Sequence, residues 1–316
     1  MLQLSYIRDN KEKVIKGLNK RHFKELELID QVLDLDEKRR ATQAELDQVL
    51  AQSNKLSKEV GALMKAGKKE EAEEVKSQTA QYKELTKKLG DTLDQVTQEL
   101  TQLLYRIPNI PTDIVPEGKS AEDNLTVFQA GEIPTLPQGA LPHWELAKKY
   151  DIIDFELGVK LTGAGFPVYK GKGAKLQRAL ITYFLDKNTE AGYQEYQVPH
   201  MVNEDSGYGT GQLPDKEGQM YHVQLDNLYL IPTAEVPVTN IFRDTILSEN
   251  DLPFCCTAYT PCFRREAGSY GAHVRGLNRL HQFDKVEIVR IEHPDRSYEA
   301  LEQMVEHVKG ILNELQ

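Results

Sequence analysis

The sequence predicts an α+β protein in which an N-terminal antiparallel pair of long helices precedes an antiparallel-sheet domain. Three observations support this prediction. Apolar residues recur at helical spacing through the first part of the chain, prolines then interrupt it, and short strand-like runs with few helices between them follow. A chain of 316 residues is long enough for about two domains. We place residues 1–105 in the helical arm, 106–140 in a linker and 141–316 in the second domain.

The composition excludes several classes of protein. With 40% hydrophobic and 28% charged residues, the chain is typical of globular proteins, and no apolar run reaches the ~18–20 residues of a membrane helix. The net charge of −10 excludes a generally basic nucleic-acid coat, but not binding of nucleic acid by one local face. Cys255, Cys256 and Cys262 form no disulfide framework and lack zinc-ligand spacing, so we expect thiols in a strand, no metal site and a cytoplasmic setting.

Two ladders of apolar residues predict the arm. One runs from Leu28 to Leu63 and the other from Ala72 to Leu103, in the ~3.5-residue repeat of a coiled coil. Gly67 lies between them and permits a reversal, so two helices of roughly 55 Å would pair and project into solvent. The pattern leaves two interpretations open, an oligomerisation coiled coil and an arm whose basic residues contact phosphates. These basic residues are Arg39, Arg40, Lys55, Lys58, Lys65, Lys68, Lys69, Lys76, Lys83, Lys87 and Lys88.

After the prolines, the pattern alternates between helices and strands. We expect helices at 144–150, 175–191 and 294–316, and a mobile loop near the active site at the Gly-rich residues 205–211. No Walker loop occurs, and no G-x-G-x-x-G opens a helix after a strand, so a nucleotide would not be bound in the P-loop or Rossmann manner. The expected strands are Tyr193–Val202, Gln219–Val223, Leu228–Ile231, Cys256–Phe263 and Val286–Ile291.

Residues 263–287 concentrate the chemistry between two strand-like runs. Guanidinium groups bind phosphate in a bidentate way, and glycine lets the backbone approach a ligand closely. Phe283 offers a ring face for an aromatic base, and Glu266 and Glu287 can accept hydrogen bonds from amines or hydroxyls. A surface hairpin with ordinary ion pairs is the alternative interpretation. The arginines of the segment are Arg264, Arg265, Arg275 and Arg279.

These residues resemble the signature motifs of a known family, the seryl-tRNA synthetases of class II. Phe-Arg-Arg-Glu at 263–266, with His-Gln-Phe-Asp-Lys-Val-Glu at 281–287, is similar to their second motif. Thr-Ala-Glu at 233–235 resembles their serine-binding element, and Gly-Phe-Pro at 165–167 resembles the first motif, which builds the dimer interface. Residues 1–105 match the family's tRNA-binding arm in position and length.

The resemblance implies a class II catalytic core and the activity of a serine–tRNA ligase. L-serine would react with ATP, in the presence of Mg²⁺, to give seryl-adenylate, and serine would then pass to tRNA(Ser) and, by the same resemblance, to tRNA(Sec). No protein nucleophile is required, and Arg264 is the catalytic residue because it would neutralise the α-phosphate. The resemblance also implies a cytoplasmic homodimer without a membrane partner. The residues it assigns to L-serine are Thr233, Ala234, Glu235, Arg264 and Glu287, and those it assigns to ATP are Arg264, Arg265, Glu266, Leu280 and Phe283.

One departure concerns the end of the sequence. Nothing after Glu287 resembles the family's third motif, so the sequence is similar to a C-terminally truncated member, and we expect an incomplete core with impaired catalysis. Two alternatives are a non-catalytic tRNA-binding or regulatory paralogue and a structural coiled-coil dimer with a vestigial domain. The intact motif residues argue against a loss of activity, because polar residues that serve only a lost function would be free to change. These residues are Thr233, Glu235, Arg264, Glu266 and Glu287.

Overall fold

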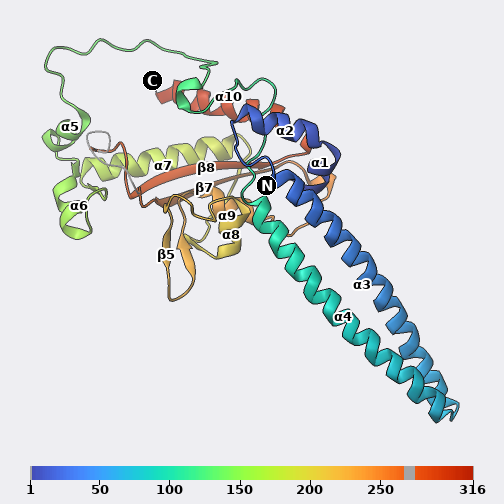
Figure 1. Cartoon of the computed structure of the whole chain (residues 1–316). Helices are drawn as coiled ribbons and strands as arrows, with labels where there is room; N and C mark the ends of the chain where they lie inside the picture. Colours follow the sequence, from blue (N-terminus) through green and yellow to red (C-terminus); the bar gives the residue numbers. More distant parts are fainter. Residues whose placement is uncertain (1, 267–274, 316) are drawn as a thin grey trace. The chain divides into compact units, whose positions relative to one another are not determined.

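The structure, a computed structural model, describes residues 2–266 and 275–315. The chain divides into two compact units, Met1–Glu132 and Ile133–Gln316, and each is described by itself (Figure 1). Across the described ranges, none of the helices has both the length and the apolar content that crossing a membrane requires.

Unit 1 contains two long antiparallel helices, α3 (Leu28–Lys65) and α4 (Lys69–Leu104), which run side by side in Figure 1. They join at Gly67, whose φ of 77° lies in the left-handed region that glycine adopts without a steric penalty. The short polar side chains of Thr42 and Ser53 are buried between the helices together with apolar ones. The predicted two-helix arm is therefore confirmed.

Two short helices, α1 (Leu4–Asp9) and α2 (Lys11–Lys20), close the base of the arm. A 3₁₀ turn at Ala121–Asp123 follows later in the same unit. Apolar side chains from both short helices pack against the first turns of α3 and the last turns of α4, so the base has its own core. Its buried members are Ile7, Val14, Leu18, Leu28, Ile29, Val32, Leu100, Leu104 and Ile107.

One charged group lies inside this base. Asp36 is 1% exposed, and its carboxylate accepts hydrogen bonds from Arg8 Nη1 at 3.1 Å, Arg39 Nη2 at 2.9 Å and Arg40 Nε at 3.0 Å. Burial opposes the charge of Asp36, but the hydrogen bonds from Arg39 and Arg40 outweigh it and lower the pKa of the carboxyl. The ion cluster therefore ties α1 to α3.

Unit 2 is built on a long antiparallel pair, β7 (Phe254–Phe263) and β8 (Gln282–Ile291). A short strand, β3 (Gln194–Glu195), adds to the other edge of β7 in parallel, giving the order β3-β7-β8. Opposite residues of an antiparallel pair share a face, and the side alternates along each strand. The register sets Ala258 opposite Glu287, Thr260 opposite Lys285, and Cys262 opposite Phe283, so these six side chains lie on one face.

The other face of this sheet is covered by α7 (Lys172–Glu190), which lies along β7 and β8 in Figure 1. Asn188 of α7 donates to Thr257 Oγ1 at 2.8 Å, and its Oδ1 lies 2.8 Å from Nε2 of His307 in α10 (Ser297–Leu315). The face that carries Glu287 is instead contacted by α9 (Glu235–Asn240). The face that carries Thr257 is thus packed against α7, and the candidate site residues lie on the face that carries Glu287.

Shorter elements complete unit 2. Two further antiparallel sheets are present, β1-β2 and β4-β6-β5. Among the described residues of unit 2, the remaining elements are α5 (His143–Lys149), β1 (Ile153–Asp154), α6 (Phe155–Leu161), β2 (Val168–Tyr169), β4 (Met201–Val202), α8 (Glu204–Gly209), β5 (Tyr221–Val223), β6 (Leu228–Leu230) and the 3₁₀ turns Glu249–Asp251 and Pro294–Arg296.

Two predictions of local structure are wrong. The run Tyr193–Val202 is not one strand, because β3 and β4 belong to different sheets and Pro199 between them has no N–H to donate to a ladder. The Gly-rich residues 205–211 are not a loop throughout, because α8 covers residues 204–209. Its N-cap is Asn203, whose Oδ1 accepts from Ser206 N at 3.0 Å.

The cysteines lie in a strand as predicted. All three are free thiols of β7, with Cys255 half-buried and Cys256 and Cys262 buried. Burial raises the pKa of each thiol, which makes the reactive thiolate rarer at neutral pH.

Candidate active site

The Thr-Ala-Glu element lies where α9 begins. Thr233 and Ala234 directly precede the helix, and Glu235 is its first residue. Thr233 is 3% exposed and Ala234 is fully buried, whereas the Glu235 side chain is exposed. The preceding Ile231 accepts a hydrogen bond at 2.8 Å from Phe263 N, at the end of β7. The element is therefore held against the sheet.

The Thr233 hydroxyl is the centre of a hydrogen-bonded group. Its Oγ1 donates to Glu287 Oε2 at 2.7 Å and accepts from the backbone N–H of Glu235 at 3.2 Å and from Lys285 Nζ at 3.0 Å. Lys285 Nζ also lies 2.5 Å from Glu287 Oε2. A hydroxyl has one proton and two lone pairs, so all the hydrogen-bonding capacity of Thr233 is used.

Sequence analysis did not single out Lys285. The signal was present, because Phe283, Lys285 and Glu287 alternate along a strand and therefore share one face. On such a face Lys285 lies next to the Glu287 carboxylate, with which its ammonium can form an ion pair. The expected strand began only at Val286, which left this alternation outside the strand.

The aromatic end of the site combines Arg264 and Phe283. Arg264 follows the last residue of β7, and its Cζ lies 5.1 Å from the centroid of the Phe283 ring. The backbone N–H of Arg264 donates to the carbonyl of His281 at 2.9 Å. Leu280, which precedes His281 in the sequence, is 7% exposed. A planar cation thus lies against an aromatic face, an arrangement that favours both stacking and anion binding.

The other arginines of the segment have separate partners. Arg279 Nη1 donates to Glu266 Oε2 at 2.8 Å, and Glu266 is only 13% exposed. Arg275 lies over the Trp144 ring, with its Cζ 5.0 Å from the centroid. Arg265 is exposed, and its backbone N–H donates to Gln219 O at 2.9 Å. Residues 267–274, which include Gly268 and Gly271 of the segment predicted to bind phosphate, lie outside the described residues.

His281 links the start of β8 to two other segments. Its N–H donates to the carbonyl of Gly165 at 2.8 Å, and its ring stacks on Phe166 with centroids 5.2 Å apart. Its Nδ1 shares a hydrogen bond of 2.6 Å with the Tyr221 hydroxyl. Gly165 has a φ of 83°, and a Cβ there would lie 2.4 Å from His281 Cδ2, so glycine is required. These contacts tie the start of β8 to Gly165, Phe166 and Tyr221.

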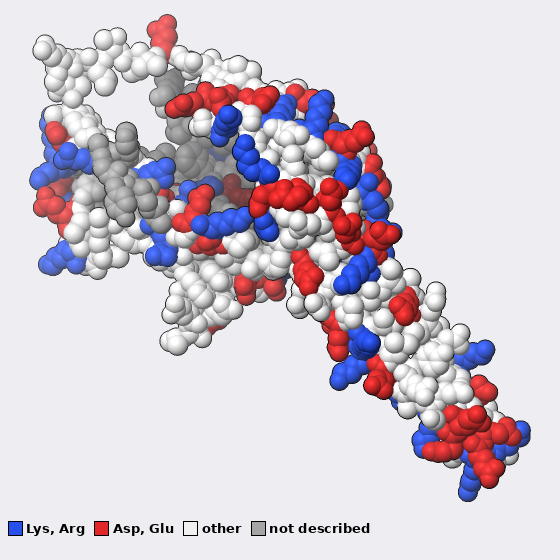
Figure 2. All heavy atoms as spheres, in the orientation of Figure 1, with Lys and Arg blue, Asp and Glu red and all other residues white. Residues whose placement is uncertain are grey.

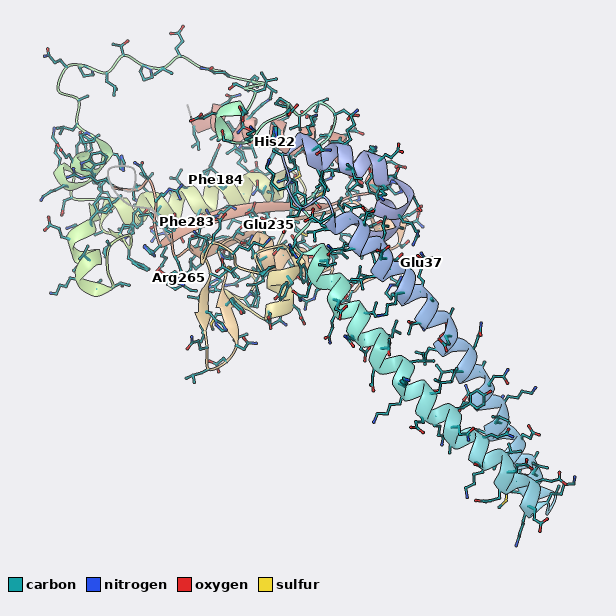
Figure 3. All side chains as sticks on the ribbon, viewed as in Figure 1. His22, Glu37, Phe184, Glu235, Arg265 and Phe283 are labelled. Carbon is teal, nitrogen blue, oxygen red and sulfur yellow. The ribbon has the colours of Figure 1, made fainter. Side chains whose placement is uncertain are left out.

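The two ends of the site lie on the same face of β7 and β8. In Figure 3 the labelled Phe283, Glu235 and Arg265 lie below α7, the helix that carries Phe184. One end offers a carboxylate among donors, which suits a small molecule with an amine and a hydroxyl. The other offers an aromatic ring and a guanidinium, which suits a nucleotide. The described residues include no group of three or more His, Cys, Asp or Glu that could hold a metal ion.

Two family profiles match the sequence. Residues 1–111 match the seryl-tRNA synthetase N-terminal domain, and residues 221–316 match the class II tRNA synthetase core domain of the G, H, P, S and T enzymes. The sequence is also similar to curated proteins. It is 46% identical over 315 residues to the serine–tRNA ligase of Salinibacter ruber and 47% identical over 323 residues to that of Methylacidiphilum infernorum. Each match covers 100% of this chain and 74% of the relative.

Solved structures share the fold. The seryl-tRNA synthetase from Pyrococcus horikoshii complexed with ATP matches with a TM-score of 0.84 and 29% identity, over 100% of this chain and 75% of that one. The cytoplasmic serine–tRNA ligase from Naegleria fowleri in complex with AMP has the same fold, with a TM-score of 0.78 and 24% identity over 98% of this chain and 75% of that one. Identity over the whole chain and the shared fold agree with the motif residues, and the chain belongs to the seryl-tRNA synthetase family of aminoacyl-tRNA ligases.

Proposed function

We propose that unit 2 activates L-serine with ATP and that unit 1, through its arm, binds the tRNA that receives the serine. The observation that carries this proposal is the placement of two groups on one sheet face. The Thr233–Glu287 pair lies at one end, and Arg264 lies over Phe283 at the other. An amino acid and a nucleotide bound at these ends would meet between them.

L-serine would occupy the carboxylate end. The Glu287 carboxylate would accept from the serine ammonium and hydroxyl, and Thr233 and Glu235 would complete the pocket. Ala234 is fully buried, so its contribution would come from its backbone. Alanine lacks the hydroxyl, and a site built to pair one rejects the analogue strongly because its own polar groups are left unpaired.

ATP would occupy the aromatic end. Adenine would stack on Phe283, with Leu280 beside it, after Arg264 has moved off the ring. Arg264 would then neutralise the α-phosphate, while Arg265 and Glu266 would bind other parts of the nucleotide. The serine carboxylate oxygen would attack the α-phosphorus, a mixed anhydride would form, and the bond to the bridging oxygen would break to release pyrophosphate. The Pyrococcus horikoshii relative is complexed with ATP, which supports ATP as the nucleotide.

Mg²⁺ would arrive with ATP rather than occupy a protein cage. Magnesium usually keeps waters and phosphate oxygens as ligands and takes only one or two carboxylates from the protein. We therefore assign no protein ligands to the ion.

The arm would bind tRNA(Ser), and by the family resemblance tRNA(Sec) as well, through phosphate contacts. On the face of the arm that Figure 2 shows, lysines and arginines are interspersed with acidic residues. Four of the eleven basic residues singled out in the sequence already pair with carboxylates, so the other seven are the better candidates. The paired ones are Arg39 and Arg40 with Asp36, Lys68 with Glu71, and Lys76 with Glu73.

We also propose domain limits and a homodimer. Residues 1–105 would act as the tRNA-binding arm, 106–140 as a linker and 141–316 as the catalytic core. Residues 165–167, with the helix and strand that follow, would build a homodimer interface.

The test is serine-dependent exchange between ATP and pyrophosphate, followed by charging of a tRNA(Ser) transcript, with the full-length gene product. Exchange that requires serine and charging of this tRNA would support the proposal. Salt-sensitive tRNA binding without exchange would instead favour a non-catalytic paralogue. A stable dimer with neither activity would favour a structural protein.

A further inference from the structure

We propose that Lys285 is a positioning residue of the amino-acid site. Its ammonium would fix the Thr233 hydroxyl and the Glu287 carboxylate in the one arrangement that accepts serine. The inference rests on the proposed function and adds a residue to it. It starts from the contacts of Lys285 Nζ, which lies 3.0 Å from Thr233 Oγ1 and 2.5 Å from Glu287 Oε2.

The direction of each hydrogen bond follows from the donors present. An ammonium has three donors and no acceptor, so Thr233 Oγ1 must accept from Lys285, as it does from the backbone N–H of Glu235. Both lone pairs of the hydroxyl are then in use. Its single proton has only the 2.7 Å contact with Glu287 Oε2 left to make. Lys285 therefore removes the freedom of the hydroxyl to turn away from Glu287.

The same contacts orient the carboxylate. Thr233 and Lys285 both bind Oε2 of Glu287, and Oε1 takes part in neither contact. A carboxylate held by one oxygen presents the other in a fixed direction, so the substrate ammonium and hydroxyl meet an acceptor that is already placed. The Lys285 and Glu287 charges also cancel, which suits an amino acid that is itself a zwitterion.

The surroundings restrict how these side chains could rearrange. The residues opposite Lys285 and Glu287 on β7 are Thr260 and Ala258, which are both fully buried. Lys285 and Glu287 are 33% and 19% exposed, so water screens this pair less than a surface pair. Loss of the ammonium would leave the carboxylate without its charge partner and free to take other rotamers.

The test compares Lys285→Met with wild type in serine-dependent pyrophosphate exchange, using the full-length gene product. We expect the KM for serine to rise about tenfold or more, the loss typical of a hydrogen bond to a charged group, while the KM for ATP changes much less. The ratio of kcat/KM for serine over alanine should fall, which a general loss of folded enzyme would not cause. Lys285→Arg, which keeps the charge and the donors, should recover most of the affinity.

Lys170→Met is the matched control. Lys170 has a similar exposure of 38% and also contacts two carboxylate oxygens, Asp151 Oδ1 at 2.6 Å and Asp154 Oδ2 at 3.2 Å, in the same unit. Its loss should leave the KM for serine within about twofold. Should Lys285→Met fail to fold by circular dichroism, Lys285→Gln, which keeps a donor without the charge, takes its place.

A double-mutant cycle with Thr233→Ala separates positioning from direct contact. If Lys285 acts through Thr233 and Glu287, the double variant should be little worse than the worse single variant. If the two substitutions instead raise the KM for serine by factors that multiply in the double variant, the Lys285 ammonium contacts the substrate directly, and the positioning role is overturned. An unchanged KM for serine in Lys285→Met would overturn the inference while wild-type exchange upholds the function. Absence of exchange in wild type would overturn both.

Discussion

The Arg264 guanidinium lies 5.1 Å from the centroid of the Phe283 ring, the surface on which we propose that adenine stacks. The same side chain is our candidate for the α-phosphate. Both assignments hold together only if Arg264 leaves the ring when the base arrives. The exchange costs little, because the stacking lost by the cation is replaced by stacking of the base and by a phosphate contact.

Replacement of Arg264 by alanine should remove the charge that stabilises the reacting phosphate. We expect adenylate formation to fall about 10²-fold or more, the usual loss when one such donor is deleted. Serine-dependent pyrophosphate exchange measures it. Arg296→Ala is the control, because Arg296 is a 54% exposed arginine of the same unit. Exchange within about tenfold of wild type for Arg264→Ala would contradict the assignment.

Gly165 accepts a hydrogen bond from the backbone N–H of His281 and leaves no room for a side chain beside the His281 ring. Gly165→Ala would place a methyl group 2.4 Å from His281 Cδ2 at a φ of 83°, so we expect a loss of about 2 kcal/mol or more in the free energy of unfolding. Urea denaturation followed by circular dichroism measures this change.

Gly310→Ala is the matched control in the same unit. Gly310 lies within α10, and a Cβ there meets nothing within 4 Å, so this change should be neutral or stabilising by up to about 1 kcal/mol. Equal stability of the two variants would show that His281 can move aside at no cost.

At the residue scale, the structure shows which of the predicted site residues lie together. The Arg264 and Phe283 pair and the Thr233 and Glu287 pair were singled out separately from the sequence, and the structure brings each pair into contact. Lys285 was missed because the expected strand began only at Val286, which left the alternation of Phe283, Lys285 and Glu287 outside it.

At the scale of elements, local signals succeeded in the arm and failed in part of the sheet domain. The arm repeats one apolar pattern over many turns, so α3 and α4 follow from the sequence almost alone. The split of residues 193–202 between β3 and β4 depends on partners far along the chain, β7 and β6. Short strands carry too few residues to specify such partners.

The arm helices also depend on a buried charge, which sets a pH dependence. The pKa of Asp36 is lowered in the folded protein, so the stability it contributes is present above the ordinary pKa of an aspartate, about 4, and is lost as the pH falls through the folded value. We expect Asp36→Asn to destabilise unit 1 by about 2 kcal/mol at neutral pH, because the amide that replaces the buried carboxylate carries no charge to pair with Arg8, Arg39 and Arg40.

Thermal unfolding of both proteins across pH measures this dependence. The difference between wild type and Asp36→Asn should shrink as the pH falls well below 4, where wild-type Asp36 is protonated too. Asp30→Asn is the control, because Asp30 is 64% exposed and pairs with Lys11 at the surface, so its loss should cost little at any pH. A difference that is constant across pH would exclude the charge as its cause.

At the scale of the whole molecule, the two units have separate cores. The base of the arm packs nine buried apolar residues within unit 1, and the β7–β8 sheet packs on α7 and α9 within unit 2. The outer part of the arm is stabilised by contacts between its own two helices. Removal of the outer arm in unit 1 should therefore leave unit 2 folded.

The outer arm can be deleted without disturbing either core. Deletion of residues 43–90, bridged by a short glycine linker, would remove the outer arm and keep Asp36, Val32 and Leu100 in the base core. We expect serine-dependent pyrophosphate exchange to stay largely intact, because no residue of the proposed site is touched. Charging of tRNA(Ser) should collapse, because the phosphate contacts of the arm supply affinity that weakens steeply with salt.

Both reactions are measured in one preparation of the full-length gene product, and the oligomeric state is followed by light scattering. Asp30→Asn serves as the control for a change of charge within unit 1 that leaves the arm in place. Loss of exchange together with charging would mean that the arm supports the catalytic unit itself. Unchanged charging with a dissociated oligomer would instead establish the arm as an oligomerisation coiled coil, the interpretation that the apolar repeat alone leaves open.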